Sequence, residues 1–155
     1  MGERSCLGEA DNYMLLEVPS LAATPPLCRV AVAVFATALP FTLAEIEELK
    51  VAISEAVSNS VQHAYPGTCG RITLRASIVH TALIVEVQDW GCGIPDVARA
   101  RTPAFTTSAD PDHIGMGFSF MEQFTDHLDV SSTQGTGTLV RMTKTPHALA
   151  APTGE

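Results

Sequence analysis

One expected helix carries three side chains that could act together in chemistry. In the stretch SEAVSNSVQHAYPG, residues 54–67, a carboxylate, an amide and an imidazole stand four residues apart, at Glu55, Asn59 and His63. At about 100° per residue they follow one side of the helix, away from its apolar stripe. They form either a solvated face or a row of groups directed at a ligand. The small residues around them leave room for a ligand, but the helix alone leaves both interpretations open.

Three glycine-containing segments further along could bring bare backbone to the same ligand. DWGCGIP, residues 89–95, places Asp89 at the end of an expected strand, followed by a turn that a flat ligand can approach because no Cβ intervenes. HIGMGFSF, residues 113–120, sets two glycines at a helix start, where unpaired amides favour phosphate. QGTGT, residues 134–138, precedes the last expected strand. Taken alone, each segment is better explained as an ordinary turn, helix cap or hairpin.

Other nucleotide and hydrolase motifs are absent from the sequence. It has no G-x-x-x-x-G-K-[ST] phosphate loop and no G-x-G-x-x-G between a strand and a helix near the start of a unit. It has no G-x-S-x-G and nothing that resembles a Ser-His-Asp set. P-loop, Rossmann and serine-hydrolase chemistry are therefore disfavoured.

Composition restricts the partners and the compartment. The 155 residues suit one domain, and 46% hydrophobic residues suffice for a core. A formal net charge of −8 argues against direct nucleic-acid binding, although backbone amides and a metal ion can still hold a nucleotide. The four cysteines lack zinc-site spacing, and neither a signal peptide nor a membrane span is evident. We expect a cytoplasmic protein with free thiols and no membrane partner.

Periodicity and turn residues predict helices in one group and antiparallel hairpins in another. This pattern predicts an α+β fold, a two-layer sandwich whose mixed, mostly antiparallel sheet carries helices on one face. The valines leave a strand open as an alternative to a helix over 29–35. The helices are expected over 24–39, from Thr42 to Pro66, at 97–100 and over 116–124; the strands are expected at 13–20, 71–79, 82–89, 128–132 and 137–144.

The helix ends and the domain limits follow from the same patterns. Thr24 is a candidate N-cap, and Thr42 with Glu45 fits a capping box. We expect Glu45 to lie among the long charged side chains of the exposed helix face. The apolar residues that recur at helical spacing are Leu43, Ile46, Leu49, Ile53, Val57 and Ala64. All of them except Leu43 fall in a narrow apolar stripe on one side of the helix. The predicted organisation is a flexible leader at 1–12, one domain at 13–144 with a functional lid at about 97–115, and a disordered tail at 145–155.

Taken in order, these motifs resemble one superfamily. The Glu-x-x-x-Asn helix, the D-x-G-x-G turn, the G-x-G-F helix start and the final Gly-Thr strand resemble the GHKL ATPases, which include gyrase, chaperone, histidine kinase and mismatch-repair proteins. Within this superfamily the chain resembles the bacterial anti-sigma factors that double as serine-protein kinases, especially the sporulation type, the anti-sigma F factors. The resemblance extends from about residue 13 to residue 144 and includes ARTPAFTT ahead of GMGF.

The resemblance implies ATP and Mg²⁺ as cofactors and assigns roles to particular residues. Asn59 would coordinate the metal ion, and Glu55 would act as general base towards a substrate serine. Asp89 would accept a hydrogen bond from the adenine amino group. The other implied nucleotide contacts, at the adenine end or in the lid over the phosphates, are Gly91, Gly93, Thr138, Thr106, Thr107, Gly115 and Gly117.

The implied protein partners meet a surface that includes Arg29. Three positions depart from the family pattern, which often has an arginine near the γ-phosphate, a lysine after the lid threonines and an acidic residue four before the interface arginine. In the same order, this chain has His113, Ser108 and Pro25 at these positions. The first two departures affect the expected phosphate contacts and the kinase rate, and the third affects the expected partner surface. His113 can still donate a hydrogen bond when protonated, which would make the activity pH-sensitive.

The function implied by the resemblance is a regulatory switch. A homodimer would hold a sporulation sigma factor inactive when it is bound to ATP, and would phosphorylate a serine of the anti-anti-sigma antagonist. Two alternatives remain open: a stress-response anti-sigma kinase, and a nucleotide-responsive binding module without kinase activity. A histidine-kinase ATPase half is disfavoured, because no dimerisation helix with a phospho-accepting histidine is evident ahead of the domain.

Overall fold

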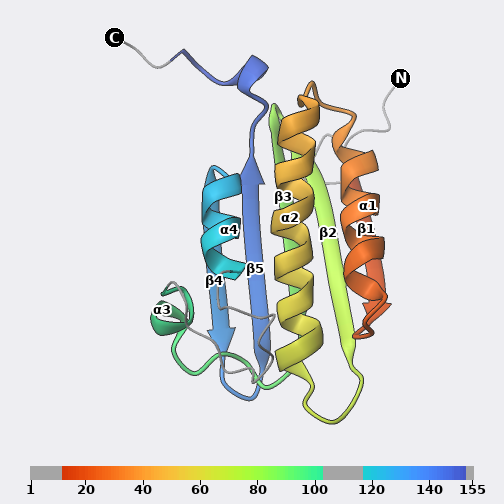
Figure 1. Cartoon of the computed structure of the whole chain (residues 1–155), viewed down its shortest axis with the longest axis vertical. Coiled ribbons are helices and arrows are strands. Elements are labelled where there is room, and N and C mark those ends of the chain that lie inside the picture. The colour runs from red at the N-terminus through yellow and green to blue at the C-terminus, as the bar shows by residue number, and fades with distance from the viewer. Residues whose placement is uncertain (1–11, 103–116, 153–155) are drawn as a thin grey trace, which may run out of the picture.

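The structure, a computed structural model, describes residues 12–102 and 117–152 and places one sheet behind a layer of helices (Figure 1). The strands are β1 (Asn12–Pro19), β2 (Arg71–Val79), β3 (Ala82–Asp89), β4 (His127–Thr133) and β5 (Gly137–Lys144). The helices are α1 (Thr24–Ala36), α2 (Leu43–Asn59), α3 (Val97–Ala100) and α4 (Gly117–Phe124), with a π-helical turn at Ser60–Ala64 and a 3-10 turn at His147–Leu149.

The sheet confirms both expected hairpins and the α+β fold. Its strand order is β1-β2-β3-β5-β4, and every pairing among the described residues is antiparallel. The hairpin of β4 and β5 joins the first one through β5, which lies beside β3. In this register Asp89, at the end of β3, stands opposite Thr138 of β5. Two of the expected functional residues therefore meet at one end of the sheet.

Helices α1, α2 and α4 cover one face of the sheet, and α2 lies between the other two (Figure 1). The core forms where α2 meets the inward side chains of β2 and β3, including Ile53, Val57, Leu74 and Val85. This packing confirms the central part of the expected apolar stripe. It also excludes a strand over 29–35, because those residues lie within α1.

Of the two helix N-caps expected from the sequence, one is confirmed and one is wrong. Thr24 is not an N-cap; Ala23 holds that position, and the Thr24 hydroxyl donates to the Pro19 carbonyl. The capping box of α2 is confirmed, with the Thr42 hydroxyl accepting from the Glu45 amide and the Glu45 carboxylate accepting from the Thr42 amide. Leu43, the first residue of the recurring apolar series, is 78% exposed and does not pack in the core.

Glu45 is only 3% exposed, which corrects the expectation that it lies on the exposed face. The reason is the segment after β5, which lies beside the start of α2 (Figure 1). The His147 amide donates to Glu45 Oε1 at 2.8 Å, and the Thr145 amide donates to Asp126 Oδ2 at 2.7 Å. Residues 145–149 are thus held by backbone hydrogen bonds and differ from the disordered tail that was expected from 145 onward.

The buried carboxyl of Glu45 makes this junction sensitive to pH. Burial raises the pKa of Glu45, but the hydrogen bonds from Thr42 and His147 outweigh burial and leave the pKa below its ordinary value of 4.5. Because the folded-state pKa is lowered, ionised Glu45 stabilises the protein above the ordinary value. That contribution is lost as the pH falls through the folded-state pKa.

We expect Glu45→Gln to lower the free energy of unfolding by about 1–2 kcal/mol near pH 7, because two backbone amides lose a charged acceptor. Urea unfolding near pH 7 and at an acidic pH below the lowered folded-state pKa measures this, and the deficit should shrink at the acidic pH, where wild-type Glu45 also becomes neutral. Glu47→Gln is the control, since Glu47 is exposed and pairs only with Lys50 among the interactions described, which is worth about 0–1 kcal/mol. An equal deficit for Glu45→Gln at both pH values would contradict this account.

Candidate functional site

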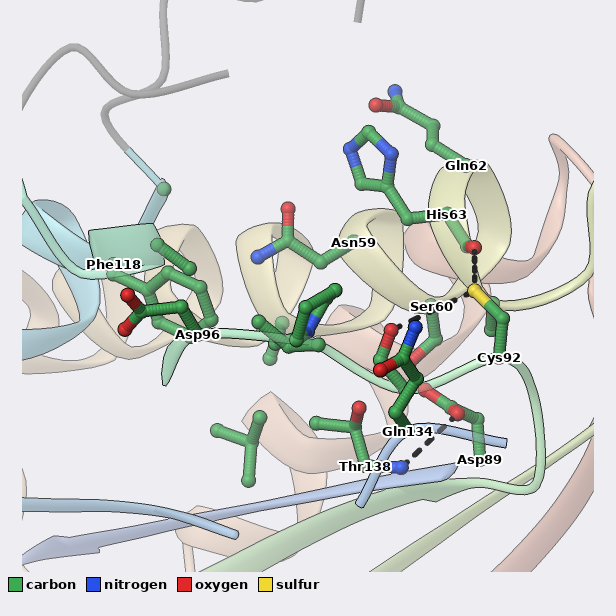
Figure 2. A pocket seen from close by; sticks show the side chains of 18 of the residues that line it. Asn59, Ser60, Gln62, His63, Asp89, Cys92, Asp96, Phe118, Gln134 and Thr138 are labelled. Carbon is green, nitrogen blue, oxygen red and sulfur yellow. Dashed lines mark hydrogen bonds between the residues drawn. The ribbon is translucent and has the colours of Figure 1, made fainter. Parts of the chain in front are cut away.

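A cavity of about 530 Å³ opens where the end of α2, the turn after β3, the start of α4 and the ends of β3 and β5 meet (Figure 2). It is lined by five of the residues expected from the sequence, namely Asn59, Asp89, Gly93, Gly117 and Thr138. These residues come from four separate segments of the chain. The fold therefore assembles one site from motifs that looked ordinary when taken singly.

Asp89 lies at the floor of the cavity because of the strand that carries it. Buried and half-buried positions alternate along β3, and Asp89 falls in the buried series with Val85 and Val87, on the face towards the helices. Asp89 is 4% exposed as a residue, but its carboxylate is well supplied with donors. Oδ2 accepts from the Ser60 hydroxyl at 2.8 Å, and Oδ1 accepts from the Gly91 and Thr138 amides at 3.1 and 3.2 Å. A charge buried in this way is held rigidly as an acceptor.

The hydroxyl of Ser132 connects the neighbouring strand ends to the turn after β3. It accepts from the Ile94 amide at 2.7 Å and lies 2.8 Å from the Thr138 hydroxyl. These bonds keep Thr138 at the cavity wall and hold the turn against β4. No local pattern in the sequence marks Ser132, because its role depends on the pairing of Ser132 with Thr138 across β4 and β5.

The glycines of the D-x-G-x-G turn are required by close backbone approach. A Cβ on Gly91 would lie 2.1 Å from the Ala64 carbonyl oxygen, which also accepts from the Cys92 amide at 2.8 Å. Gly93 has a φ of +74°, and a Cβ there would lie 2.3 Å from the Thr133 carbonyl oxygen. The turn is therefore docked between the end of α2 and β4. Gly93 lines the cavity, whereas Gly91 shapes it from behind by donating to Asp89.

The row on α2 points towards the start of α4. A Cβ placed on Gly117 would lie 3.0 Å from Glu55 Oε2 and 3.5 Å from Asn59 Nδ2. Asn59 and His63 project into the cavity on the same side of the helix (Figure 2). Of the two interpretations of the row, a fully solvated face is therefore excluded for Asn59 and His63.

Glu55 lies outside this cavity, in an open groove between α1 and α2. Arg29 and Lys50 line the same groove. Glu55 thus stands between two spaces, with Asn59 and Gly117 on one side and the Arg29 groove on the other. The structure brings Arg29 and Glu55 together although they are far apart in the sequence.

Part of the expected site lies outside the described residues. This applies to Thr106, Thr107 and Gly115, to the departures at Ser108 and His113, and to most of the expected lid. Within 12–102 and 117–152, no group of three or more acids, histidines or cysteines could hold a metal ion. No helix in those ranges is both long and apolar enough to cross a membrane.

Ser60 and Arg99 are among the cavity residues that no motif in the sequence marks, although a signal existed for Ser60. Ser60 follows Val57 and precedes Ala64 at the helical spacing of the apolar stripe, so a hydroxyl occupies a position that faces the core. Arg99 of α3 also lines the cavity and is the only lysine or arginine among its described lining residues. Its position follows from the path of the turn after β3, which no local pattern indicates.

A matched pair of glycine-to-alanine variants separates the close packing at Gly93 from backbone strain. Gly67 has a similar φ of +69°, but a Cβ placed there would have nothing within 4 Å. We expect Gly67→Ala to lower the free energy of unfolding by about 1–2 kcal/mol through strain alone. Gly93→Ala should lose about 1–3 kcal/mol more, because its Cβ meets the Thr133 carbonyl. Urea unfolding of both variants measures the difference, and equal losses would show that the turn is not packed against β4 as described.

Comparison with known proteins places this site in a family. Residues 18–144 match the histidine kinase-like ATPase domain. The chain is 46% identical over 136 residues to the anti-sigma F factor of Caldanaerobacter subterraneus, and the aligned residues cover 88% of this chain and 95% of that protein. It is 37% identical over 134 residues to the anti-sigma F factor of Bacillus subtilis, covering 86% of this chain and 92% of that protein.

A solved structure supports the fold independently. The RsbU and RsbW domains of Rv1364c from Mycobacterium tuberculosis superpose with a TM-score of 0.61 at 16% identity, covering 86% of this chain and 32% of that one. At this identity the likeness concerns the fold alone. The match of 18–144 and the extent of identity over nearly the whole chain decide the family. The chain belongs to the histidine kinase-like ATPase domain family and, within it, to the anti-sigma F factors.

Proposed function

We propose that this chain binds Mg-ATP, inhibits a sporulation sigma factor in the cytoplasm and phosphorylates a serine of the anti-anti-sigma antagonist. The observation that carries the proposal is the position of Glu55. It stands between a cavity with the features of a nucleotide site and an open groove that contains Arg29. A kinase acting on a protein needs a base at such a junction, with the phosphoryl donor on one side and the protein substrate on the other.

The adenine base is proposed to bind at Asp89. The carboxylate is buried, is fixed by the Ser60, Gly91 and Thr138 donors, and still has acceptor capacity towards the cavity. The adenine amino group is a donor that suits such an acceptor. Gly93 contributes wall without a side chain, so a flat ring can lie against the backbone.

The phosphates are proposed to lie between Asn59 and the start of α4. The Asn59 amide oxygen is a neutral ligand of the kind Mg²⁺ accepts, and that ion commonly takes its remaining ligands from phosphates and water. Bound Mg²⁺ would neutralise phosphate charge during transfer. Gly117 begins an eight-residue helix, whose first amides have no partner within the helix and favour an anion. Thr106, Thr107 and Gly115 are proposed to complete the phosphate site.

Glu55 is proposed as the general base. As the substrate serine oxygen bonds to the γ-phosphorus, the bond from that phosphorus to the oxygen bridging to ADP breaks, and Glu55 takes the serine proton. The carboxylate is half-buried, which keeps it oriented towards Gly117 while leaving it open to the groove. Its side chain therefore has access to both reactants.

The protein partners are proposed to dock over the groove that contains Arg29. Next to it on α1, Leu27, Val30 and Val34 are exposed apolar side chains spaced along one side of the helix. An acidic chain, with a net charge of −8, also favours a basic partner surface. We propose that the sigma factor and the antagonist use this surface, and that the working unit is a homodimer.

The two alternatives differ from this proposal in ways that can be measured. A stress-response anti-sigma kinase would share the chemistry but bind another sigma factor. A binding module without kinase activity would respond to nucleotide without transferring phosphate, and the placement of Glu55 beside the groove argues against it. Binding to a panel of sigma factors with and without ATP distinguishes the first, and phosphotransfer distinguishes the second.

We expect Glu55→Gln to keep ATP and sigma-factor binding but to slow serine phosphorylation of the antagonist by about 10²–10⁴-fold, because the hydroxyl loses its base. Transfer of labelled phosphate from Mg-ATP measures the rate. Glu17→Gln changes an exposed carboxylate of β1 that lines neither the cavity nor the groove, and it should leave the rate near wild type. A normal rate in Glu55→Gln would remove Glu55 as the base.

We expect Asn59→Ala to weaken Mg-ATP binding by about 100-fold, since the metal ion loses its protein ligand. Titration calorimetry with ATP in the presence of Mg²⁺, and again with a chelator, measures the effect. The loss should be large only with Mg²⁺ present, because the adenine end of the cavity is unaltered. An equal loss under both conditions would contradict the metal assignment.

A further inference from the structure

Ser60 is a polar residue at a position where the pattern of α2 calls for an apolar one. Val57 precedes it and Ala64 follows it along the stripe that faces the core, and both are buried. Ser60 itself is 7% exposed. A buried hydroxyl without a partner would be destabilising, so its hydrogen bond identifies its purpose. That bond is the 2.8 Å donation to Asp89 Oδ2.

The backbone that carries Ser60 also holds the turn after Asp89. The helix changes from α to π geometry at Ser60, and π-helical turns are rare and occur frequently at functional sites. At the far end of this turn the Ala64 carbonyl accepts from the Cys92 amide. One short helical segment therefore positions both the donor to Asp89 and the loop behind Asp89.

The hydrogen bonds around Asp89 leave a definite pattern of donors and acceptors facing the cavity. An ionised carboxylate has about four lone-pair sites, and the Ser60, Gly91 and Thr138 donors occupy three of them. One site remains, on Oδ2. Ser60 has a single hydroxyl proton, which it gives to Asp89, so its oxygen can only accept from a ligand. Both residues line the cavity, and at this point they present adjacent acceptors.

We propose that Ser60 is a specificity-determining residue that acts through Asp89 to select a purine with an amino group at the 6-position and to reject one with a carbonyl there. The inference rests on the proposed binding of a nucleotide base at Asp89. An amino group donates to these acceptors, whereas a carbonyl oxygen would face two groups that offer it no proton. Such a mismatch leaves buried polar groups unpaired and is strongly unfavourable.

The hydroxyl matters because of what would replace it. In Ser60→Ala, Asp89 loses a donor and the vacated space can admit a water molecule. Water has two protons, so it can donate one to Asp89 and the other to a ligand carbonyl. The cavity would then tolerate either group at the 6-position. Removing one hydroxyl should therefore lower selectivity between bases as well as affinity.

ADP and IDP are suitable probes, because their bases differ in the amino or carbonyl group at the 6-position and the associated ring proton. Titration calorimetry of the full chain gives the affinity for each. We expect wild type to prefer ADP by about 100-fold or more. In Ser60→Ala, ADP affinity should fall about tenfold while IDP affinity is unchanged or higher, so that the preference falls at least about tenfold. Ser58→Ala, the same substitution on the same helix away from the cavity, should leave the preference unaltered.

A second pair of variants tests the hydroxyl at nearly constant shape. Ser60→Thr keeps the donor and should retain the preference for ADP, whereas Ser60→Val lacks it and should lose the preference as Ser60→Ala does. Circular dichroism establishes that each variant is folded. An equal fall in ADP and IDP affinity, with the preference intact in Ser60→Ala and Ser60→Val, would make Ser60 merely structural and overturn this inference. Failure of wild type to bind ADP would instead overturn the proposed function.

Discussion

The buried carboxylate of Asp89 is the constraint around which the functional end of this protein is arranged. A charge that is 4% exposed is tolerated only when donors surround it, and here they come from three different segments. Ser60 reaches it from the end of α2, Gly91 from the turn and Thr138 from β5. Meeting this requirement forces the helix end, the turn and the strand together. The cavity is the space that this convergence leaves.

The second organising element is α2, which serves different purposes on its two sides. One side packs Ile53 and Val57 against the sheet and gives the helix a fixed orientation. The other carries Glu55 and Asn59 towards the start of α4. A row of functional groups on a helix is useful only if the helix cannot rotate, so the core packing on one side is what makes chemistry on the other side reliable. The capping box and the segment across Glu45 anchor its beginning.

Local patterns predicted much of this fold. The hairpins of β2 with β3 and of β4 with β5, the capping box of α2 and the central apolar stripe all appear as expected. Each depends on interactions between residues close in sequence. Of the expectations that were wrong, one involves a distant partner: Glu45 is buried because residues 145–149 lie against it. The other is local, since the Thr24 hydroxyl donates to Pro19, five residues earlier, instead of capping its helix.

The sequence by itself determined the chemical types and their spacing: a carboxylate and an amide one helical turn apart, an acid before a glycine turn, and glycines at a later helix start. Together with the family resemblance, that was enough to predict the family. Only the tertiary structure decided that Asp89 pairs with Thr138, that Ser60 points at Asp89, and that Arg29 shares a groove with Glu55. The reason is physical. Spacing along a helix or strand follows from local backbone geometry, whereas these contacts depend on strand register and on packing between segments far apart in the chain.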